Sequence, residues 1–133
     1  MIDANETFDG TWPFAPRFSE ASGFRQHYVD EGSQDAEVVL CLHGEPTWGY
    51  LYRKMIGPLS EKFRVVVPDH MGFGKSETPQ DRLYTSDARR ESRAFCGRTR
   101  LARHNYCLSG LGGTNGGGFY REKPGEGKAV VHC

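Results

Sequence analysis

The segment that most constrains the fold is an apolar run followed at once by a tight polar turn. Residues 37–42 read Glu-Val-Val-Leu-Cys-Leu, and His43-Gly44-Glu45-Pro46-Thr47-Trp48 follows directly. Such a run, rich in β-branched and aliphatic residues, is typical of a strand buried on both faces, as a parallel sheet requires. Cys41 falls inside this strand, where it packs as a small apolar group. The sequence therefore predicts an α/β protein with strand 37–42 inside a parallel sheet.

Two further strands and one helix are predicted around this run. The strands cover about 24–29, before the turn Asp30-Glu31-Gly32, and about 64–68. Between 50 and 63 apolar residues recur at helical spacing and predict a helix. Its inner face is expected to carry Leu51, Met55, Ile56, Leu59 and Phe63. Strand, helix and strand in this order form a βαβ unit, so residues 1–85 are expected to be part of an α/β domain.

The pattern changes after Thr85. Residues 1–85 hold 8 Lys and Arg against 13 Asp and Glu, a net −5, whereas residues 86–133 hold 9 against 4, a net +5. Residues 110–118 include six glycines, and no Ile occurs after Thr85. Ordering so many glycines is entropically unfavourable. We expect residues 86–133 to be irregular or disordered and to form no domain.

Composition excludes several classes of protein. No stretch approaches the roughly 18 consecutive apolar residues of a membrane helix. Residues 1–6 lack the basic start and apolar stretch of a secretion signal, so we expect a cytoplasmic protein. The cysteines, Cys41, Cys96, Cys107 and Cys133, show no paired spacing, and we expect no metal and no cofactor. Nucleic-acid binding by the arginine-rich tail is a remote alternative, because aromatic residues do not alternate with the arginines there.

Three motifs together resemble the haloalkane dehalogenases, a branch of the α/β-hydrolase fold. The resemblance covers about residues 13–85. The long middle motif is specific, whereas the last turn, Gly72-Phe73-Gly74-Lys75-Ser76, is shared by the superfamily. The motifs are His27-Tyr28-Val29-Asp30-Glu31-Gly32; His43-Gly44-Glu45-Pro46-Thr47-Trp48 with Tyr50-Leu51-Tyr52-Arg53-Lys54-Met55-Ile56; and Pro68-Asp69-His70-Met71-Gly72-Phe73-Gly74-Lys75-Ser76.

The resemblance implies hydrolysis of carbon–halogen bonds in a small-molecule substrate. In this family an Asp nucleophile displaces halide from an alkyl carbon, and a His-activated water hydrolyses the resulting ester. The backbone N–H of Glu45 would serve the oxyanion hole, with His43, Gly44 and Pro46 shaping the turn. Epoxide hydrolases and other α/β-hydrolases are the alternative, because His-Gly-x-Pro and Gly-x-Gly-x-Ser are shared with them.

Three conspicuous residues have structural interpretations within the same resemblance. Asp69 is expected to stabilise its loop rather than to act as the nucleophile. Trp48 is expected to pack, and His27 is a strand residue with no evident partner.

A one-base frameshift in the gene explains why the resemblance ends. If the codons after Thr85 are read one base late, those of residues 109–115 permit Gln-Asp-Trp-Gly-Gly-Pro-Met, which resembles the family's nucleophile turn with its halide-binding Trp. The chain as written then lacks both the nucleophile and the catalytic His, and we expect it to be truncated and inactive. Strand 37–42 also loses its neighbour, so we expect an open sheet edge and an unfolded, insoluble or rapidly degraded chain.

Overall fold

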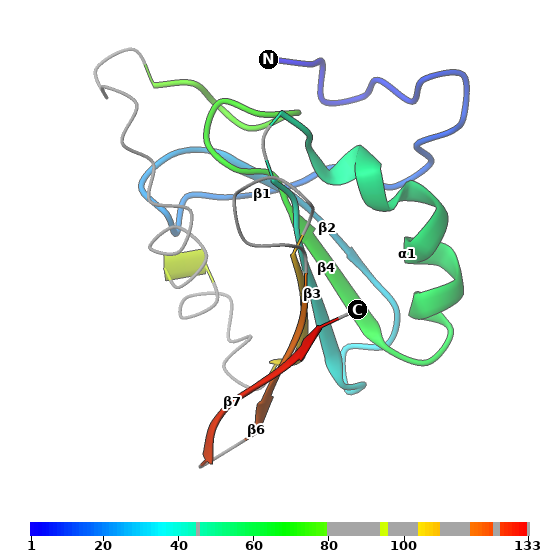
Figure 1. Cartoon of the computed structure of the whole chain (residues 1–133). Coiled ribbons are helices and arrows are strands. Elements are labelled where there is room, and N and C mark those ends of the chain that lie inside the picture. The colour runs from blue at the N-terminus through cyan, green and yellow to red at the C-terminus, as the bar shows by residue number, and fades with distance from the viewer. Residues whose placement is uncertain (45, 80–93, 96–103, 110–117, 124–125, 133) are drawn as a thin grey trace.

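The computed structural model describes residues 1–44, 46–79, 94–95, 104–109, 118–123 and 126–132. Within them the chain forms a seven-stranded sheet in the order β1-β2-β4-β3-β5-β6-β7 (Figure 1). A 3₁₀ helix, η1 (Gly49–Tyr52), leads directly into α1 (Arg53–Ser60), which lies along one face of the sheet. The strands are β1 (Arg17–Ser19), β2 (Gln26–Glu31), β3 (Val38–Leu42), β4 (Arg64–Pro68), β5 (His104–Ser109), β6 (Gly118–Lys123) and β7 (Glu126–His132).

The centre of the sheet is parallel and both flanks are antiparallel. β3 pairs in parallel with β4, so that Val39 lies opposite Val65 and Leu40 opposite Val66. η1 and α1 connect these two strands, which confirms the predicted βαβ unit. β1, β2 and β4 pair antiparallel, as do β5, β6 and β7. The expectation of a parallel sheet therefore holds only for the centre, because short connections such as residues 20–25 can join only antiparallel neighbours.

β2 begins and ends two residues later than predicted. Its last residues, expected to form a turn, pair with β4, with Asp30 opposite Val66 and Glu31 opposite Val65. Arg64 stabilises this extension by donating from Nε and Nη2 to the two carboxylate oxygens of Asp30, at 2.8 and 2.6 Å. The turn begins only at Gly32, where φ is +95°. β1 was not predicted, since its three residues are too short to show a strand pattern.

The helical segment presents most of the predicted face to the core, since Ile56 is buried and Leu59 and Phe63 pack against the larger core cluster. Leu51 and Met55 were expected to face the core, but they are 46% and 39% exposed, whereas Tyr52 and Ile56 are buried. The core-facing residues Tyr52, Ile56, Leu59 and Phe63 follow one another at helical spacing. Leu51 and Met55 each lie one position before a core-facing residue and so fall on the solvent side of this face. The α-helix also ends at Ser60 rather than at residue 63. After this end, the amides of Lys62 and Phe63 both donate to the carbonyl of Leu59.

The sheet edge expected to be open is occupied in the structure. β5 pairs in parallel with β3, with Leu40 opposite Cys107 and Leu42 opposite Ser109. β5, β6 and β7 thus lie within the range expected to be irregular, and for these three stretches the structure differs from that expectation. The physical reason is that ladder hydrogen bonds use backbone groups, so an exposed strand edge can be paired by a stretch with little apolar character. The rest of the range 86–133, apart from residues 94–95, lies outside the described residues.

Both faces of the two central strands are buried, as predicted for them. Alternate residues of β3 and β4 point to opposite sides of the sheet. The face toward α1 contains the larger cluster, and the other face is covered in part by Phe95, which is fully buried. The larger cluster consists of Trp12, Val29, Val39, Cys41, Tyr52, Ile56, Val65 and Val67. The smaller one consists of Val38, Leu40, Val66 and Phe95.

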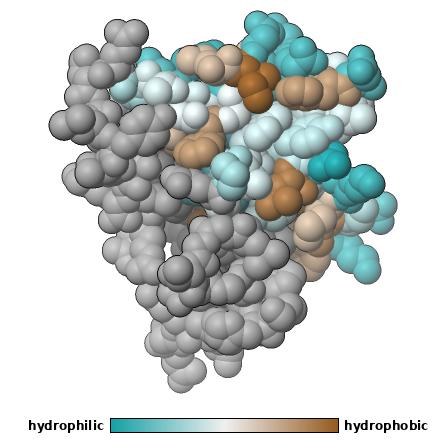
Figure 2. Space-filling view, turned by 45° about the horizontal axis from the view of Figure 1, so that its top comes forward, coloured by the Kyte–Doolittle hydropathy of each residue, from teal (hydrophilic) through white to brown (hydrophobic). Residues whose placement is uncertain are grey.

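The described residues on the face shown in Figure 2 are mostly polar, with separate apolar groups between them. Figure 2 shows brown side chains interrupted by teal and white ones on the face in view. Among the described residues, the exposed large hydrophobic side chains are Met1, Leu51 and Met55. None of the helices in this part of the chain has both the length and the apolar character that crossing a membrane requires.

Gly32 offers a direct test of the turn between β2 and β3. A Cβ at this position would overlap the carbonyl oxygen of Phe63, and its positive φ disfavours any L-residue. We expect Gly32→Ala to lower the free energy of unfolding by about 1–3 kcal/mol. The matched control is Gly57→Ala in α1, where a Cβ meets nothing within 4 Å and helix propensity should raise stability by about 0.5–1 kcal/mol. Equal shifts of the two denaturation midpoints would contradict this account of the turn.

Candidate functional site

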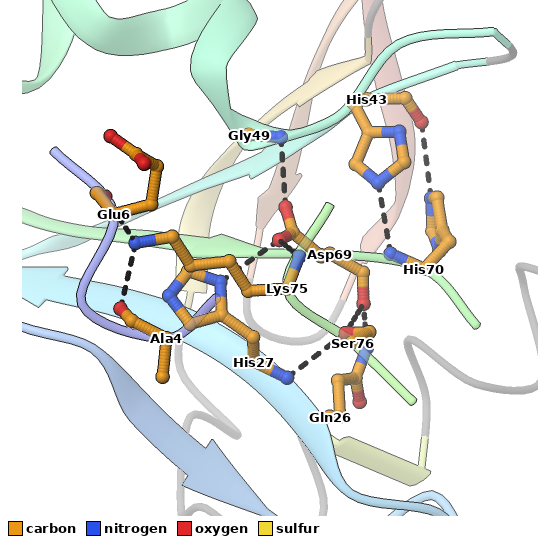
Figure 3. A network of polar contacts seen from close by, with 10 residues as sticks. All are labelled: Ala4, Glu6, Gln26, His27, His43, Gly49, Asp69, His70, Lys75 and Ser76. Carbon is orange, nitrogen blue, oxygen red and sulfur yellow. Dashed lines mark hydrogen bonds and ion pairs between the residues drawn. The ribbon is translucent and has the colours of Figure 1, made fainter. Parts of the chain in front are cut away.

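Two loops meet at the carboxyl end of the parallel strands. One is the turn after β3, residues 43–48, and the other is the loop after β4, residues 69–76. Parallel neighbours end at the same edge of a sheet, and ligand sites of α/β folds lie at that edge. The site is therefore built by the backbone of both loops and by the side chains that connect them (Figure 3).

Asp69 joins these loops through its carboxylate. Oδ1 accepts a hydrogen bond from the amide of Gly49 at 2.8 Å, and Oδ2 accepts one from the amide of Lys75 at 3.0 Å. Oδ2 also accepts from Nδ1 of His27 at 2.9 Å. The residue is fully buried. Three donors and complete burial fit the predicted loop-stabilising role, and they leave the carboxylate no exposed surface from which to attack a substrate.

His27, which had no evident partner in the sequence, is the buried partner of Asp69. A carboxylate only accepts, so the imidazole proton lies on Nδ1. The backbone amide of His27 donates to the hydroxyl of Ser76, and that hydroxyl donates to the carbonyl of Asp69. Gln26 donates to the same carbonyl at 3.0 Å. β2 therefore holds the start of the second loop through side chains as well as through the sheet ladder.

His43 and His70 are joined by two reciprocal hydrogen bonds. The amide of His70 donates to Nε2 of His43 at 2.9 Å, and Nε2 of His70 donates to the carbonyl of His43 at 3.0 Å. The two rings lie 4.4 Å apart between centroids. Because Nε2 of His43 accepts, its proton lies on Nδ1. A ring whose lone pair is occupied by a backbone amide is a structural element and not a general base.

The carbonyl of Gly44 receives three donors in this turn. They are the amide of Thr47 at 2.9 Å, the hydroxyl of Thr47 at 2.6 Å and Nδ1 of His43 at 3.2 Å. Pro46 is exposed, and Glu45, the predicted oxyanion donor, lies outside the described residues. Thr47 was not predicted as a residue of this turn's hydrogen-bond network, although a hydroxyl three residues after a glycine carbonyl is a recognisable local motif.

Aromatic side chains pack around Trp48 at the end of this turn, and Gly74 of the second loop leaves room for it. Trp48 contacts Trp12, Tyr50 and Phe8, with ring centroids 5.1, 5.5 and 5.7 Å away, consistent with the packing role expected for it. Gly74 has φ +54°, and a Cβ there would overlap the Asp69 carboxylate and meet the Trp48 ring. The two loops can therefore approach this closely only with glycine at position 74.

Lys75 fastens the N-terminal segment to the second loop. Its ammonium donates to the carbonyls of Ala4 and Glu6 at 2.8 and 2.7 Å, and the side chain is almost fully buried. Burial lowers the pKa of Lys75 below its ordinary value, although the nearby carboxylates of Asp69, Glu6 and Asp3 act in the opposite direction. Within the part of the chain that the structure describes, no group of three or more His, Cys, Asp or Glu side chains could hold a metal ion.

Residues 37–109 match a family model described as alpha/beta hydrolase fold. The chain belongs to this family.

Its relatives include haloalkane dehalogenases. One from Psychrobacter cryohalolentis is 57% identical over 65 residues, which cover 48% of this chain and 22% of that protein. A cis-3-alkyl-4-alkyloxetan-2-one decarboxylase from Xanthomonas campestris pv. campestris is 46% identical over 76 residues, which cover 56% of this chain and 25% of that protein. The chain thus spans about a quarter of the length of these curated relatives.

Solved structures show the same relationship. The tetrameric structure of haloalkane dehalogenase DpaA from Paraglaciecola agarilytica NO2 has a TM-score of 0.65 and 37% identity. The match covers 74% of this chain and 35% of that one.

The hydrogen bonds of the Asp69 carboxylate predict how its replacement changes the free energy of unfolding. In Asp69→Asn one carboxylate oxygen becomes an NH₂ group, which faces amide donors and cannot accept from them. Each buried donor that loses its acceptor costs about 1–3 kcal/mol, so we expect the free energy of unfolding to fall by at least this amount. The control is Asp35→Asn at an exposed position, for which we expect a change within about 0.5 kcal/mol. Equal, small effects in urea unfolding would contradict the role given to Asp69.

The lowered pKa of Lys75 predicts a pH dependence of stability. The folded chain binds this proton less tightly than the unfolded chain, whose lysine titrates near 10.5. The free energy of unfolding should therefore rise with pH between the lowered folded pKa and this ordinary value. We expect the stability of the wild type relative to Lys75→Met to increase across that window, measured by chemical denaturation at successive pH values. A difference that stays constant with pH would be inconsistent with a desolvated ammonium.

Proposed function

We propose that the gene encodes a cytoplasmic, haloalkane dehalogenase-like α/β-hydrolase and that residues 1–85 form part of its α/β-hydrolase domain. The backbone N–H of Glu45 would supply half of the oxyanion hole. The observation that carries the proposal is the turn directly after β3, whose Gly44 carbonyl is fixed by three donors at the carboxyl edge of the parallel strands. The 57% identity to the Psychrobacter enzyme over 65 residues supports the choice of family branch.

In the proposed reaction, residues 1–85 would contribute to the oxyanion hole, whereas the Asp nucleophile and the catalytic His are residues that the chain lacks. An Asp carboxylate would displace halide from an alkyl carbon and form an ester. Water, deprotonated by a His, would then add to the ester carbonyl, and the negative charge would develop on the carbonyl oxygen. Donors placed before the reaction stabilise that charge without reorganisation. The turn after β3 therefore serves the second half of the reaction.

We further propose that residues 86–133 are read out of frame, so that the chain as written is inactive. In the alternative phase the Asp codon of the nucleophile turn spans codons 110 and 111, directly after the last residue of β5, Ser109. β5 lies parallel to β3, which is the place of the nucleophile-bearing strand in the family resemblance. The proposal therefore rests on the codon match and on the position of that match directly after residue 109.

An epoxide hydrolase or another α/β-hydrolase is the second candidate. The decarboxylase from Xanthomonas campestris favours keeping it, because that relative matches over a similar length with 46% identity. The matched portion would contribute to the oxyanion hole, which enzymes with different substrates can share. Halide release from a chloroalkane, against diol formation from an epoxide, separates the two candidates.

The decisive experiment begins with the nucleotide sequence. We expect it to permit an Asp-Trp pair in the alternative phase at codons 110–112, and an impossible codon there would end the frameshift proposal. The frame-corrected gene should then yield a protein that releases halide from chloroalkanes, measured by a halide electrode. The matched control is the same protein with the new nucleophile codon changed to Asn, for which we expect no turnover.

Two outcomes would contradict the proposal in different ways. Halide release by the chain as written would refute the frameshift. A corrected protein that folds, yet turns over neither chloroalkanes nor epoxides, would refute both candidate activities.

A further inference from the structure

The N-terminal segment, residues 2–11, lies outside the sheet and contacts both loops of the candidate site. Its first part is held by the second loop. The ammonium of Lys75 donates to the carbonyls of Ala4 and Glu6 at 2.8 and 2.7 Å (Figure 3). The Lys75 side chain is almost completely buried, so these charge-assisted hydrogen bonds are shielded from water. Lys75 is therefore a strong anchor for the first part of the segment.

The second part of the segment is held by aromatic rings at the end of the first loop. The ring centroid of Phe8 lies 5.7 Å from that of Trp48 and 5.3 Å from that of Tyr50. The hydroxyl of Thr11 donates to the carbonyl of Phe8 at 2.7 Å and accepts from the hydroxyl of Tyr50 at 2.7 Å. The segment thus has two anchors, and they lie on different loops.

Hydrogen bonds within the segment join these two anchors. The amide of Phe8 donates to Oε1 of Glu6 at 2.7 Å, so the residue held by Lys75 also holds the residue that carries the ring. The amide of Trp12 donates to the carbonyl of Thr7 at 2.9 Å and closes the following turn. Because the two anchors are connected through the backbone, release of either one should also loosen the other.

Two features disfavour the docked conformation of this segment. Phe8 and Asp9 have φ +51° and +55°, a region that residues other than glycine keep only where surrounding contacts impose it. Within the described part of the chain, Nε1 of Trp12 is buried without an acceptor, which is also unfavourable. Docking of the segment therefore depends on its anchors, and segments of this kind open more readily than the core strands.

We infer that residues 2–11 form a strap, which docks on the two loops and leaves them as a single unit while the sheet stays intact, with Lys75 and the ring of Phe8 as its two anchors. The inference goes beyond the proposed function and does not depend on it. Trp12 is 1% exposed and belongs to the larger core cluster, so it is the fixed point at which the strap joins the domain. When the strap leaves, it uncovers the aromatic rings at the end of the first loop.

The first test removes one anchor and observes the other by NMR. Lys75→Met removes the ammonium and keeps a long side chain, and Lys62→Met at an exposed position is the matched control. We expect only Lys75→Met to shift the ring-proton resonances of Phe8 toward those of an unstructured chain. The same variant should raise the exchange rate of the Trp12 amide roughly tenfold or more. The amide of Arg64 at the start of β4 should keep its exchange rate.

The second test removes the other anchor. Phe8→Ala deletes the ring, and Phe14→Ala is the matched control, because the Phe14 ring contacts that of Trp12 at 4.9 Å but lies outside the strap. The amide of Ile2 donates to the carbonyl of Gly74 at 3.0 Å, at the opposite end of the strap. We expect Phe8→Ala, and not Phe14→Ala, to raise the exchange rate of this amide by a similar factor.

Three results would overturn the inference. Unchanged Phe8 resonances in Lys75→Met, or unchanged exchange of the Ile2 amide in Phe8→Ala, would show that the two anchors act independently. Equal loss of protection at Arg64 in either variant, complete unfolding included, would show that the strap does not separate from the sheet.

Discussion

The buried carboxylate of Asp69 is the contact on which the rest of the site depends. It accepts from the backbone of Gly49, the first residue of η1 after the first loop, from the backbone of Lys75 in the second loop, and from the His27 side chain on β2. Backbone amides in loops buried at a sheet edge need acceptors, and a single carboxylate can serve several of them. Without it, these donors would be buried without partners, and only the reciprocal hydrogen bonds of His43 and His70 described above would still connect the two loops.

The direction of the strands brings both loops to this carboxylate. β3 and β4 are parallel neighbours, so the turn after one and the loop after the other must emerge at the same edge. β2 reaches the same edge because it pairs antiparallel with β4 and carries His27 toward the loop that follows β4. The glycine at position 74 then lets the loops approach to contact distance. Strand direction, one carboxylate and one glycine together define where the Gly44 peptide lies.

Much of this site could be anticipated from residue patterns, but only for features that are local. The strand at 37–42, the turn after it and the loop-stabilising role of Asp69 follow from short motifs. The partner of His27 did not, because the two residues lie 42 positions apart in the sequence and meet only through the pairing of β2 with β4. The exposure of Leu51 and Met55 was missed for another reason. Each lies one position before a core-facing residue, Tyr52 or Ile56, and apolar periodicity does not separate the margin of a helix face from its centre.

Apolar periodicity and contiguous motifs are properties of neighbouring residues, and they were enough to predict the βαβ centre, the polar turn after β3 and the α/β-hydrolase fold. Tertiary structure alone decided the partners: which histidine holds which carboxylate, which donors saturate the Gly44 carbonyl, and which strand lies beside β3. β5 occupies that edge although its residues predict a poor strand. Backbone groups at an open edge pair with whatever strand the fold brings near, and that proximity is a property of the whole chain rather than of any segment.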